Sequence, residues 1–174
     1  MEESVLLHIC CGACSLYCID DLKINFNYEI TGYYANPNIH PYEEFMRRRG
    51  STIKACNAKE IPLIIEESYN IQKWKKWEGS NADRCKMCYT VRADMTAKKA
   101  SELGFEYYTS TLFVSPYQNH ELMKEIFEET GNKYGVKFLY RDFREGFRNG
   151  QQQARELGLY RQKYCGCIKS LQGE

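Results

Sequence analysis

The chain opens on a short apolar run that leads into a cysteine-rich loop: residues 5–15 read Val-Leu-Leu-His-Ile-Cys-Cys-Gly-Ala-Cys-Ser. Residues 5–9 are apolar and partly β-branched, and they end at cysteine and glycine, which predicts a buried strand followed by a loop. In open parallel sheets, ligands bind at the carboxyl ends of strands. A nucleotide-binding protein would place a glycine-rich phosphate loop at this point, whereas this chain places thiols. The stretch therefore predicts sulfur chemistry at one edge of an α/β sheet.

Further strand patterns alternate with helix patterns along the rest of the chain. Strands are expected at residues 5–9, 28–34, 61–65, 105–112 and 136–140, and helices at residues 15–22, 41–56, 84–103, 115–130 and 151–157. This alternation predicts an α/β fold, a single-domain parallel sheet with helices on both faces. The length of 174 residues suits one domain, and no repeat or linker interrupts it. Residues 1–174 are therefore expected to form a single catalytic domain.

The composition excludes several classes of protein. Hydrophobic residues make up 43% and charged residues 27%, which is typical of a globular protein and unlike collagen, a coiled coil or a disordered tail. No segment approaches the roughly 20 apolar residues of a membrane helix. The acidic first residues and their short apolar run do not match an export signal. We therefore expect a cytoplasmic protein with no membrane partner.

Charge is distributed unevenly, although the formal net charge is only +1. Residues 1–46 carry one base against seven acids, whereas residues 71–100 carry eight against three and residues 133–174 carry nine against four. Two interpretations remain open: a basic face that docks a polyanion, or ordinary solvated helix faces. Trp74 and Trp77, which stand among lysines, are the candidates for an RNA-facing patch.

Nine cysteines are the unusual feature of the composition. In a reducing compartment, and with an odd count, they indicate metal binding or redox chemistry rather than a disulfide framework. Seven of them fall into three tight groups: Cys10, Cys11 and Cys14; Cys85 and Cys88; and Cys165 and Cys167. The C-x-x-C spacing lets two thiolates reach one metal or cluster. An iron–sulfur cluster, which accepts cysteines from scattered segments, is favoured over structural zinc or a metal-free thiol protein.

The remaining candidates carry weaker signals. Cys165 and Cys167, separated by one glycine, predict either a redox-active pair, which would form a strained disulfide on oxidation, or the ligands of a second metal. Cys18 and Cys56 are expected to be packing residues, and His8 to be a buried histidine within the first strand. His40 is a candidate site residue because it follows a strand end on a loop.

Five motifs resemble those of the QueH family, the cobalamin-independent epoxyqueuosine reductases. They span nearly the whole chain in order: Leu-Leu-His-Ile-Cys-Cys-Gly-Ala-Cys at 6–14, Tyr-Ala-Asn-Pro-Asn-Ile-His-Pro at 34–41, Arg-Cys-Lys-Met-Cys-Tyr at 84–89 with Arg92, Ser-Thr-Leu at 110–112 with Ser115-Pro116, and Tyr-Cys-Gly-Cys at 164–167. One departure is Ala13, where the family usually has proline; this affects the stiffness of the loop more than its chemistry.

The resemblance implies a fold, an activity and a set of site residues. It implies a sheet similar to that of the adenine nucleotide α-hydrolases, and the reduction of epoxyqueuosine to queuosine at the wobble position of tRNA. The implied cofactor is a [4Fe-4S] cluster, and Cys10, Cys11, Cys85 and Cys88 are its implied ligands. Cys165 and Cys167 match the family's redox-active pair, and Cys14 is left as a ligand for an additional iron ion.

Two rival functions remain open. An iron–sulfur tRNA sulfur transferase would use a related sheet, but it would need an ATP-binding Ser-Gly-Gly-x-Asp-Ser loop where this chain has Cys-Cys-Gly-Ala-Cys-Ser. A zinc-structured RNA-binding module is the second rival. The expected partners of the reductase are tRNA carrying epoxyqueuosine and an external electron donor.

Overall fold

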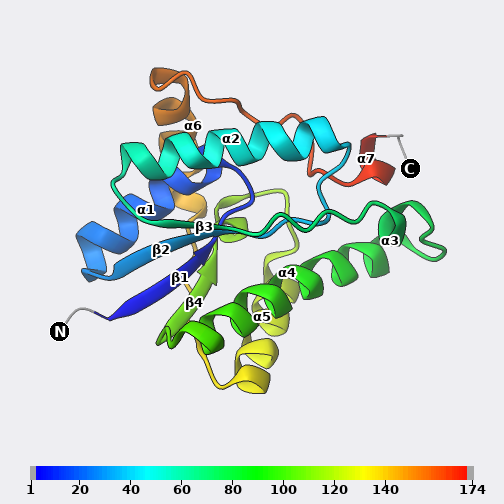
Figure 1. The fold of residues 1–174 in the computed structure, drawn as a ribbon, viewed down its shortest axis with the longest axis horizontal. Coiled ribbons are helices and arrows are strands. Elements are labelled where there is room, and N and C mark those ends of the chain that lie inside the picture. The colour runs from blue at the N-terminus through cyan, green and yellow to red at the C-terminus, as the bar shows by residue number, and fades with distance from the viewer. Residues whose placement is uncertain (1–2, 172–174) are drawn as a thin grey trace.

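The computed structural model describes residues 3–171 and shows an α/β fold built on one sheet (Figure 1). Five parallel strands pair in the order β3-β2-β1-β4-β5. They are β1 (Ser4–His8), β2 (Glu29–Tyr34), β3 (Leu63–Ile65), β4 (Tyr107–Ser110) and β5 (Lys137–Phe138). The parallel α/β architecture expected from the alternating pattern is confirmed.

Helices cover both faces of this sheet, as expected. On one face lie α1 (Gly12–Phe26), α2 (Tyr42–Ala58) and α6 (Phe147–Glu156), and on the other lie α4 (Asn81–Leu103) and α5 (His120–Tyr134) (Figure 1). Four short helices complete the described part of the chain: α3 (Gln72–Lys75), η1 (Thr111–Val114), η2 (Arg144–Gly146) and α7 (Ile168–Leu171). No helix of the described residues is long and apolar enough to cross a membrane.

The strand order places a topological switch between β1 and β4. The chain builds outward from β1 through β2 to β3 and then returns to add β4 and β5 on the other side. At such a switch the loops after two neighbouring strands diverge to opposite faces and leave a crevice where ligands bind. Cys10 follows β1 and Thr111 follows β4, and the Cys10 amide donates to Thr111 Oγ1 at 3.2 Å. The cysteine loop therefore lies at the switch point.

Several helix boundaries differ from those expected: α5, for example, starts at His120 after its N-cap Asn119 rather than at Ser115. Two further differences have local causes. The first helix starts at Gly12 rather than at Ser15, so Cys11 is its N-cap and Cys14 lies in its first turn. The fifth helix continues through Gly131, where a stop was expected. Gly131 stays helical against the sheet edge, where an added Cβ would lie 2.6 Å from the Val136 carbonyl oxygen, and Gly135 supplies the left-handed C-cap instead.

The fourth strand is also shorter than expected. It ends at Ser110, whose side chain accepts a hydrogen bond from the Leu112 amide and starts the 3-10 turn η1. This turn carries Thr111 toward Cys10 at the switch point, with Thr111 Oγ1 lying 3.4 Å from Cys10 Sγ.

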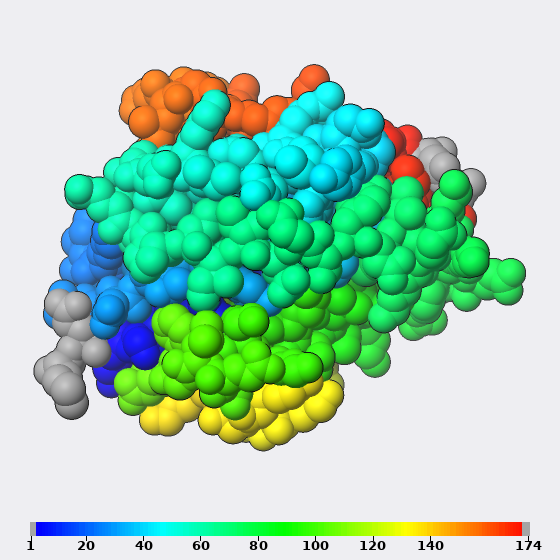
Figure 2. All heavy atoms as spheres, in the orientation of Figure 1, coloured from blue at the N-terminus to red at the C-terminus, as the bar shows by residue number. Residues whose placement is uncertain are grey.

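The space-filling view shows the orange segment that contains α6 lying along the upper rim beside α2 (Figure 2). After α6 the chain crosses toward α3 and ends in α7 at the far side from the first strand (Figure 1). This last crossing carries Cys165 and Cys167, and it places them near α3 and the start of α4.

Candidate active site

Three cysteines converge at the start of α1. The sulfur atoms of Cys10, Cys11 and Cys14 all lie within 4.8 Å of one another, and all three residues are buried. Cys11 Sγ lies 3.6 Å from Cys14 Sγ. Cys10 lies just after the end of β1, and Cys11 is the N-cap of α1. Cys14 lies in the first turn of that helix, so its sulfur atom is close to the other two. Three thiols held at these distances are a fitting donor set for a metal ion or an iron–sulfur cluster.

The three thiols share their protons unequally. Hydrogen bonds from Cys11 and Cys14 hold the pKa of Cys10 well below its ordinary value, against the opposing effect of burial. The same contacts with Cys10 raise the pKa of both Cys11 and Cys14. The group therefore favours the thiolate at Cys10 over those at Cys11 and Cys14. Since thiolates are the ligand form, metal binding here would release the remaining protons.

His8 supports this loop from the last position of β1. Burial, and then the charge of Arg92, lower the pKa of His8 to about 4, so the ring is neutral at neutral pH. Its two nitrogens lie 2.8 Å from Ser110 Oγ and 3.0 Å from Asn36 Oδ1. The prediction of a satisfied buried histidine is confirmed, and its contacts join the ends of β1 and β4 with the loop after β2.

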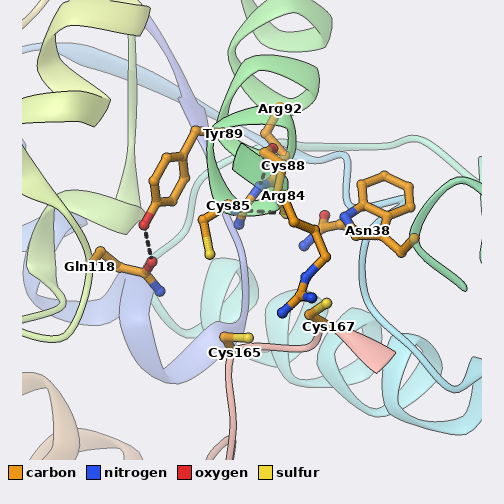
Figure 3. Close-up of a pocket in the computed structure, with 10 residues that line it drawn as sticks. Asn38, Arg84, Cys85, Cys88, Tyr89, Arg92, Gln118, Cys165 and Cys167 are labelled. Carbon is orange, nitrogen blue, oxygen red and sulfur yellow. Dashed lines mark hydrogen bonds between the residues drawn. The ribbon is translucent and has the colours of Figure 1, made fainter. Parts of the chain in front are cut away.

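A second set of four cysteines lines a pocket nearby (Figure 3). Cys85 and Cys88 lie on the early turns of α4, while Cys165 and Cys167 lie on the segment that leads to α7. Cys88 and Cys167 are buried against Trp74, whereas Cys85 and Cys165 are exposed. The other lining residues are Asn38, Trp74, Arg84, Tyr89, Arg92 and Gln118. The fold thus brings together two cysteine pairs that are far apart in sequence.

Arg92 is one of two arginines, with Arg84, that line this pocket. Its guanidinium donates to Cys88 Sγ at 3.2 Å and to the Cys88 carbonyl oxygen at 3.1 Å, and it lies over the Tyr89 ring. Burial raises the pKa of Cys88, and the charge of Arg92 opposes that effect. The charge of Arg92 also lowers the pKa of His8, which lies beside Cys10. Arg92 therefore influences residues at both cysteine groups.

The structure divides the predicted site cysteines into two groups rather than one. Cys14, which was assigned to an additional iron, is the residue that lies with Cys10 and Cys11. Cys85 and Cys88 lie instead with Cys165 and Cys167 around the pocket. The ligand set Cys10, Cys11, Cys85 and Cys88 draws two members from each group, and it stays a prediction.

The remaining two cysteines, Cys18 and Cys56, are buried in the main core, as expected of packing residues. All nine cysteines fall within residues 3–171, and each is a free thiol. The structure therefore contains no disulfide between Cys165 and Cys167.

Trp74 does not face solvent, in contrast to its assignment to an RNA-facing patch. It is only 1% exposed and packs against Cys88 and Cys167, because the short helix α3 folds its apolar side toward the pocket. Trp77 is half-buried and donates its indole N–H to the Ser80 carbonyl oxygen. His40 is buried beside Trp74 and does not line the pocket.

Two amides also line the pocket: Gln118, which the sequence did not single out, and Asn38, which was named only as part of the motif at 34–41. Gln118 Oε1 accepts a hydrogen bond from the Tyr89 hydroxyl at 2.6 Å. An amide side chain does not by itself indicate a functional site. The position of each residue does favour one, because Asn38 follows β2 and Gln118 follows β4 at the edge of the sheet where ligands bind.

The sequence profile of a family described as "Epoxyqueuosine reductase QueH" matches residues 5–173. The chain belongs to the QueH family. A QueH from Streptococcus pyogenes is 35% identical over 97% of this chain and 70% of its own length. QueH proteins from Dehalococcoides mccartyi and Thermotoga maritima are 35% and 32% identical, over 98% and 97% of this chain and 93% and 90% of their own lengths.

Two solved structures share the fold at low sequence identity. The U34-tRNA thiolase NcsA from Methanococcus maripaludis, solved with its [4Fe-4S] cluster, has a TM-score of 0.58 at 13% identity, covering 96% of this chain and 61% of NcsA. A deacetylase of teicoplanin biosynthesis has a TM-score of 0.56 at 9% identity, covering 88% of this chain and 83% of the deacetylase. Both likenesses support the α/β fold expected from the sequence.

Proposed function

We propose that this QueH-family chain reduces epoxyqueuosine to queuosine at the wobble position of tRNA. The observation that carries the proposal is the match of the QueH profile to residues 5–173, a span that includes all seven grouped cysteines. We infer that residues 1–174 act as one catalytic domain. Free thiols persist in a reducing compartment, so we place the reaction in the cytoplasm.

The proposed cofactor is a [4Fe-4S] cluster. Cys10, Cys11, Cys85 and Cys88 are its proposed ligands, and Cys14 is the proposed ligand of an additional iron. The buried sulfur donors at the switch point support this choice, because soft thiolates select iron–sulfur clusters. When bound, the cluster would supply electrons one at a time. NcsA shows that a chain with this fold can hold a [4Fe-4S] cluster.

The reaction needs two electrons and two protons for each epoxide. The epoxide oxygen leaves as water, and the two carbon atoms that held it become joined by a double bond. The Cys165 and Cys167 thiols together carry two electrons and two protons, and they would release them on closing to a disulfide. An external reductant, which remains to be identified, would then restore the thiols. If the pair instead holds a second metal, that metal would act on the epoxide oxygen as a Lewis acid.

An exposed aromatic ring beside the pocket supports an RNA substrate. Tyr117 is 84% exposed and directly precedes Gln118, which lines the pocket. The Phe147 ring supports it at right angles, with the ring centroids 6.0 Å apart. Nucleic-acid bases stack on such rings. We therefore propose Tyr117, rather than Trp74, as the ring that stacks on a base of the RNA.

Mass spectrometry of tRNA nucleosides tests the function and separates it from both rivals. The chain is reconstituted anaerobically with iron and sulfide and incubated with a reductant and epoxyqueuosine-containing tRNA. Loss of one oxygen from the modified nucleoside supports the reductase. Gain of sulfur would support the sulfur transferase, and an unchanged nucleoside together with colourless zinc-bound protein would support the RNA-binding module.

Iron counting and serine substitutions separate the two versions of the mechanism. About four irons per chain would contradict the additional iron at Cys14, because one cubane accounts for all of them. Full turnover by Cys165→Ser and Cys167→Ser variants would contradict the redox-active pair.

A further inference from the structure

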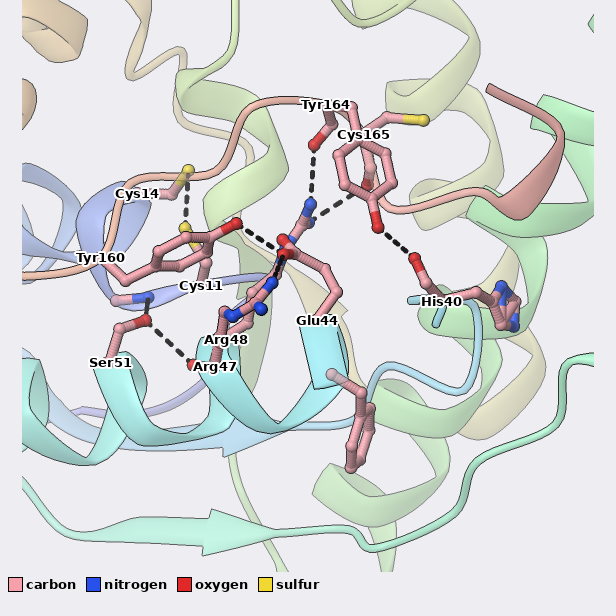
Figure 4. Close-up of polar contacts among 12 residues, drawn as sticks. Cys11, Cys14, His40, Glu44, Arg47, Arg48, Ser51, Tyr160, Tyr164 and Cys165 are labelled. Carbon is pink, nitrogen blue, oxygen red and sulfur yellow. Dashed lines mark hydrogen bonds and ion pairs between the residues drawn. The ribbon is translucent and has the colours of Figure 1, made fainter. Parts of the chain in front are cut away.

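The inward face of α2 connects the two cysteine groups. Glu44, Arg48 and Ser51 lie on this face at helical spacing, and all three are buried (Figure 4). Ser51 Oγ accepts a hydrogen bond from the Gly12 amide at 3.0 Å and donates to the Arg48 carbonyl oxygen at 3.0 Å. Arg48 is therefore one hydrogen-bonded step from the residue that follows Cys11.

The Arg48 side chain is only 1% exposed, which is rare for a charged residue. Its Nε donates to Glu44 Oε2 at 2.7 Å, so the charge is paired within the helix. Its two terminal nitrogens donate to backbone carbonyl oxygens on the C-terminal segment, Nη2 to Tyr164 at 2.7 Å and Nη1 to Cys165 at 3.2 Å. A planar guanidinium can make all three contacts at once, and a lysine ammonium cannot reproduce that fork.

Residues 160–167, which we call the strap, make further contacts with the same region. Tyr160 donates to Glu44 Oε1 at 2.5 Å, and Tyr164 donates to the His40 carbonyl oxygen. The His40 amide donates to the Gly166 carbonyl oxygen at 2.7 Å. These contacts hold the backbone on both sides of Cys165.

Gly166 is required where the strap meets α2. Its φ of 109° lies in the region that L side chains rarely adopt, and an added Cβ would lie 3.2 Å from Arg48 Nη1 and 3.1 Å from Ile39 Cγ1. The glycine between the two cysteines therefore lets the strap approach Arg48 closely enough for the carbonyl contacts.

Arg48 also lies near the first cysteine group, because Ser51 links the Arg48 carbonyl oxygen to the Gly12 amide that follows Cys11. Its guanidinium is buried, and the charge of a buried group is screened less than that of an exposed one. Figure 4 shows Arg48 between the Cys11–Cys14 loop and the strap that bears Cys165.

We propose that Arg48 is a positioning residue with two roles: its fork fixes the strap that carries Cys165 and Cys167, and its charge stabilises negative charge at the Cys11 group. The inference rests on the proposed function in taking these two groups as parts of one redox site. Fixing the strap needs the planar fork of arginine, whereas stabilising negative charge needs only a positive charge. A lysine at position 48 should therefore lose the first role and keep the second.

The test compares Arg48→Lys and Arg48→Met with the wild-type protein, all reconstituted with iron and sulfide. Arg47→Met is the matched control, because Arg47 is the neighbouring residue on α2, is 60% exposed, and contacts Glu44 only at 3.6 Å. Hydrogen–deuterium exchange of residues 160–167 measures how firmly the strap is held. A redox titration of the bound cluster measures its reduction potential, which depends on the charge at position 48.

For Arg48→Met we expect exchange in the strap to be roughly tenfold faster or more, since two charge-assisted hydrogen bonds are lost. We also expect a more negative reduction potential, because a positive charge beside the cluster favours the added electron. Arg48→Lys should show the faster exchange with a potential close to that of the wild type. Arg47→Met should change neither readout.

Unchanged strap exchange in both Arg48 variants would overturn the first role, and an unchanged potential in Arg48→Met would overturn the second. Because Arg48→Met leaves Glu44 buried without its partner, the double variant Glu44→Gln/Arg48→Met repeats both readouts without that unpaired charge. Neither readout uses epoxyqueuosine. A wild-type protein that fails to reduce the substrate would therefore contradict the proposed function, while the strap measurement would still decide the role of Arg48.

Discussion

At the scale of single residues, the chemistry depends on thiols that the fold holds in unequal states. Cys10 is the favoured thiolate of its group, with Cys11 and Cys14 as its hydrogen-bond partners. Cys18, one turn further along α1, is equally buried, but its contact is with the Cys14 carbonyl oxygen at 3.3 Å. Burial, the largest cause, raises the pKa of Cys18 well above its ordinary value. We therefore expect different roles for Cys10 and Cys18, although they lie on one loop and helix.

This difference predicts the result of removing each thiol. Cys10→Ser should lose the visible absorbance and most of the iron after anaerobic reconstitution, because a hydroxyl does not replace a thiolate ligand. Cys18→Ala should keep both, with only a small loss of stability. Iron analysis and visible absorbance of the two variants check this. A colourless Cys18→Ala protein that is still folded would contradict the assignment.

Tyr117 provides a second prediction at this scale. Tyr117→Ala should weaken binding of the tRNA substrate by about 1–3 kcal/mol, the usual contribution of one stacked base, while Tyr117→Phe should bind normally because stacking uses the ring. Leu103→Ala is the control, because Leu103 is also exposed but ends α4 at the opposite edge of the sheet. Filter binding or fluorescence titration measures the Kd. Equal affinities of Tyr117→Ala and the wild type would exclude this surface.

The sequence revealed the cysteines but not the residues that position them. Cysteines in tight groups are rare enough to indicate chemistry by themselves. The partners of Arg48 are carbonyl oxygens 116 and 117 residues away, and every residue has a carbonyl. Only the three-dimensional structure could show that these atoms converge. Trp74 shows the opposite case, since an aromatic residue among lysines was assigned to the surface and proved to be buried.

At the scale of elements, the close approach of α1 and α2 holds the cysteine loop in place. An added Cβ at Gly12 would lie 2.2 Å from the Ser51 carbonyl oxygen, so the two helices meet there without a side chain between them. Gly50, one residue before Ser51, faces open space within α2. These two glycines should respond in opposite ways to the same substitution.

Gly12→Ala should destabilise the protein by about 1–3 kcal/mol or more, because the clash is with backbone and the helices must separate. It should also reduce iron binding, since the displaced segment begins beside Cys11. Gly50→Ala should stabilise the protein by about 0.5–1 kcal/mol, because alanine restricts the unfolded chain without a clash. Urea denaturation measures both. Equal changes in the free energy of unfolding for Gly12→Ala and Gly50→Ala would contradict a close contact between α1 and α2 at Gly12.

Element types were predictable from the sequence, whereas element ends depended on tertiary contacts. The alternation of apolar strands and amphipathic helices identified all five strands. Gly131 was an equally good stop signal as Gly135, and only its packing against Val136 decided between them. The two short helices α3 and α7, which contact each other, were not predicted, because each has only four residues, too few for a periodic pattern.

At the scale of the whole molecule, we expect stability to come mainly from the apolar core. This core runs along β1, β2 and β4 and the helices that cover them, and it includes large buried side chains such as Leu6, Tyr108 and Phe127. Three cysteines of the proposed site, Cys10, Cys11 and Cys14, lie at one end of it and are a small part of its buried surface. We therefore expect the fold to differ from a zinc finger, in which the metal supplies the folding energy.

Removal of the metal should leave the protein folded. After anaerobic chelation, far-ultraviolet circular dichroism should still show the α/β fold, and urea unfolding should remain cooperative. The visible absorbance should disappear. Loss of cooperative unfolding together with the colour would show that the cluster is a structural element rather than a cofactor.

The central claim is that the cysteines at the carboxyl edge of the sheet reduce an epoxide in tRNA. The most direct measurement is mass spectrometry of nucleosides from epoxyqueuosine-containing tRNA, after incubation with reconstituted protein and reductant under anaerobic conditions. We expect the epoxyqueuosine signal to be replaced by that of queuosine, which has one oxygen fewer, and the Cys10→Ser variant to give no conversion. Unchanged epoxyqueuosine in the presence of an intact, reduced cluster would contradict this function.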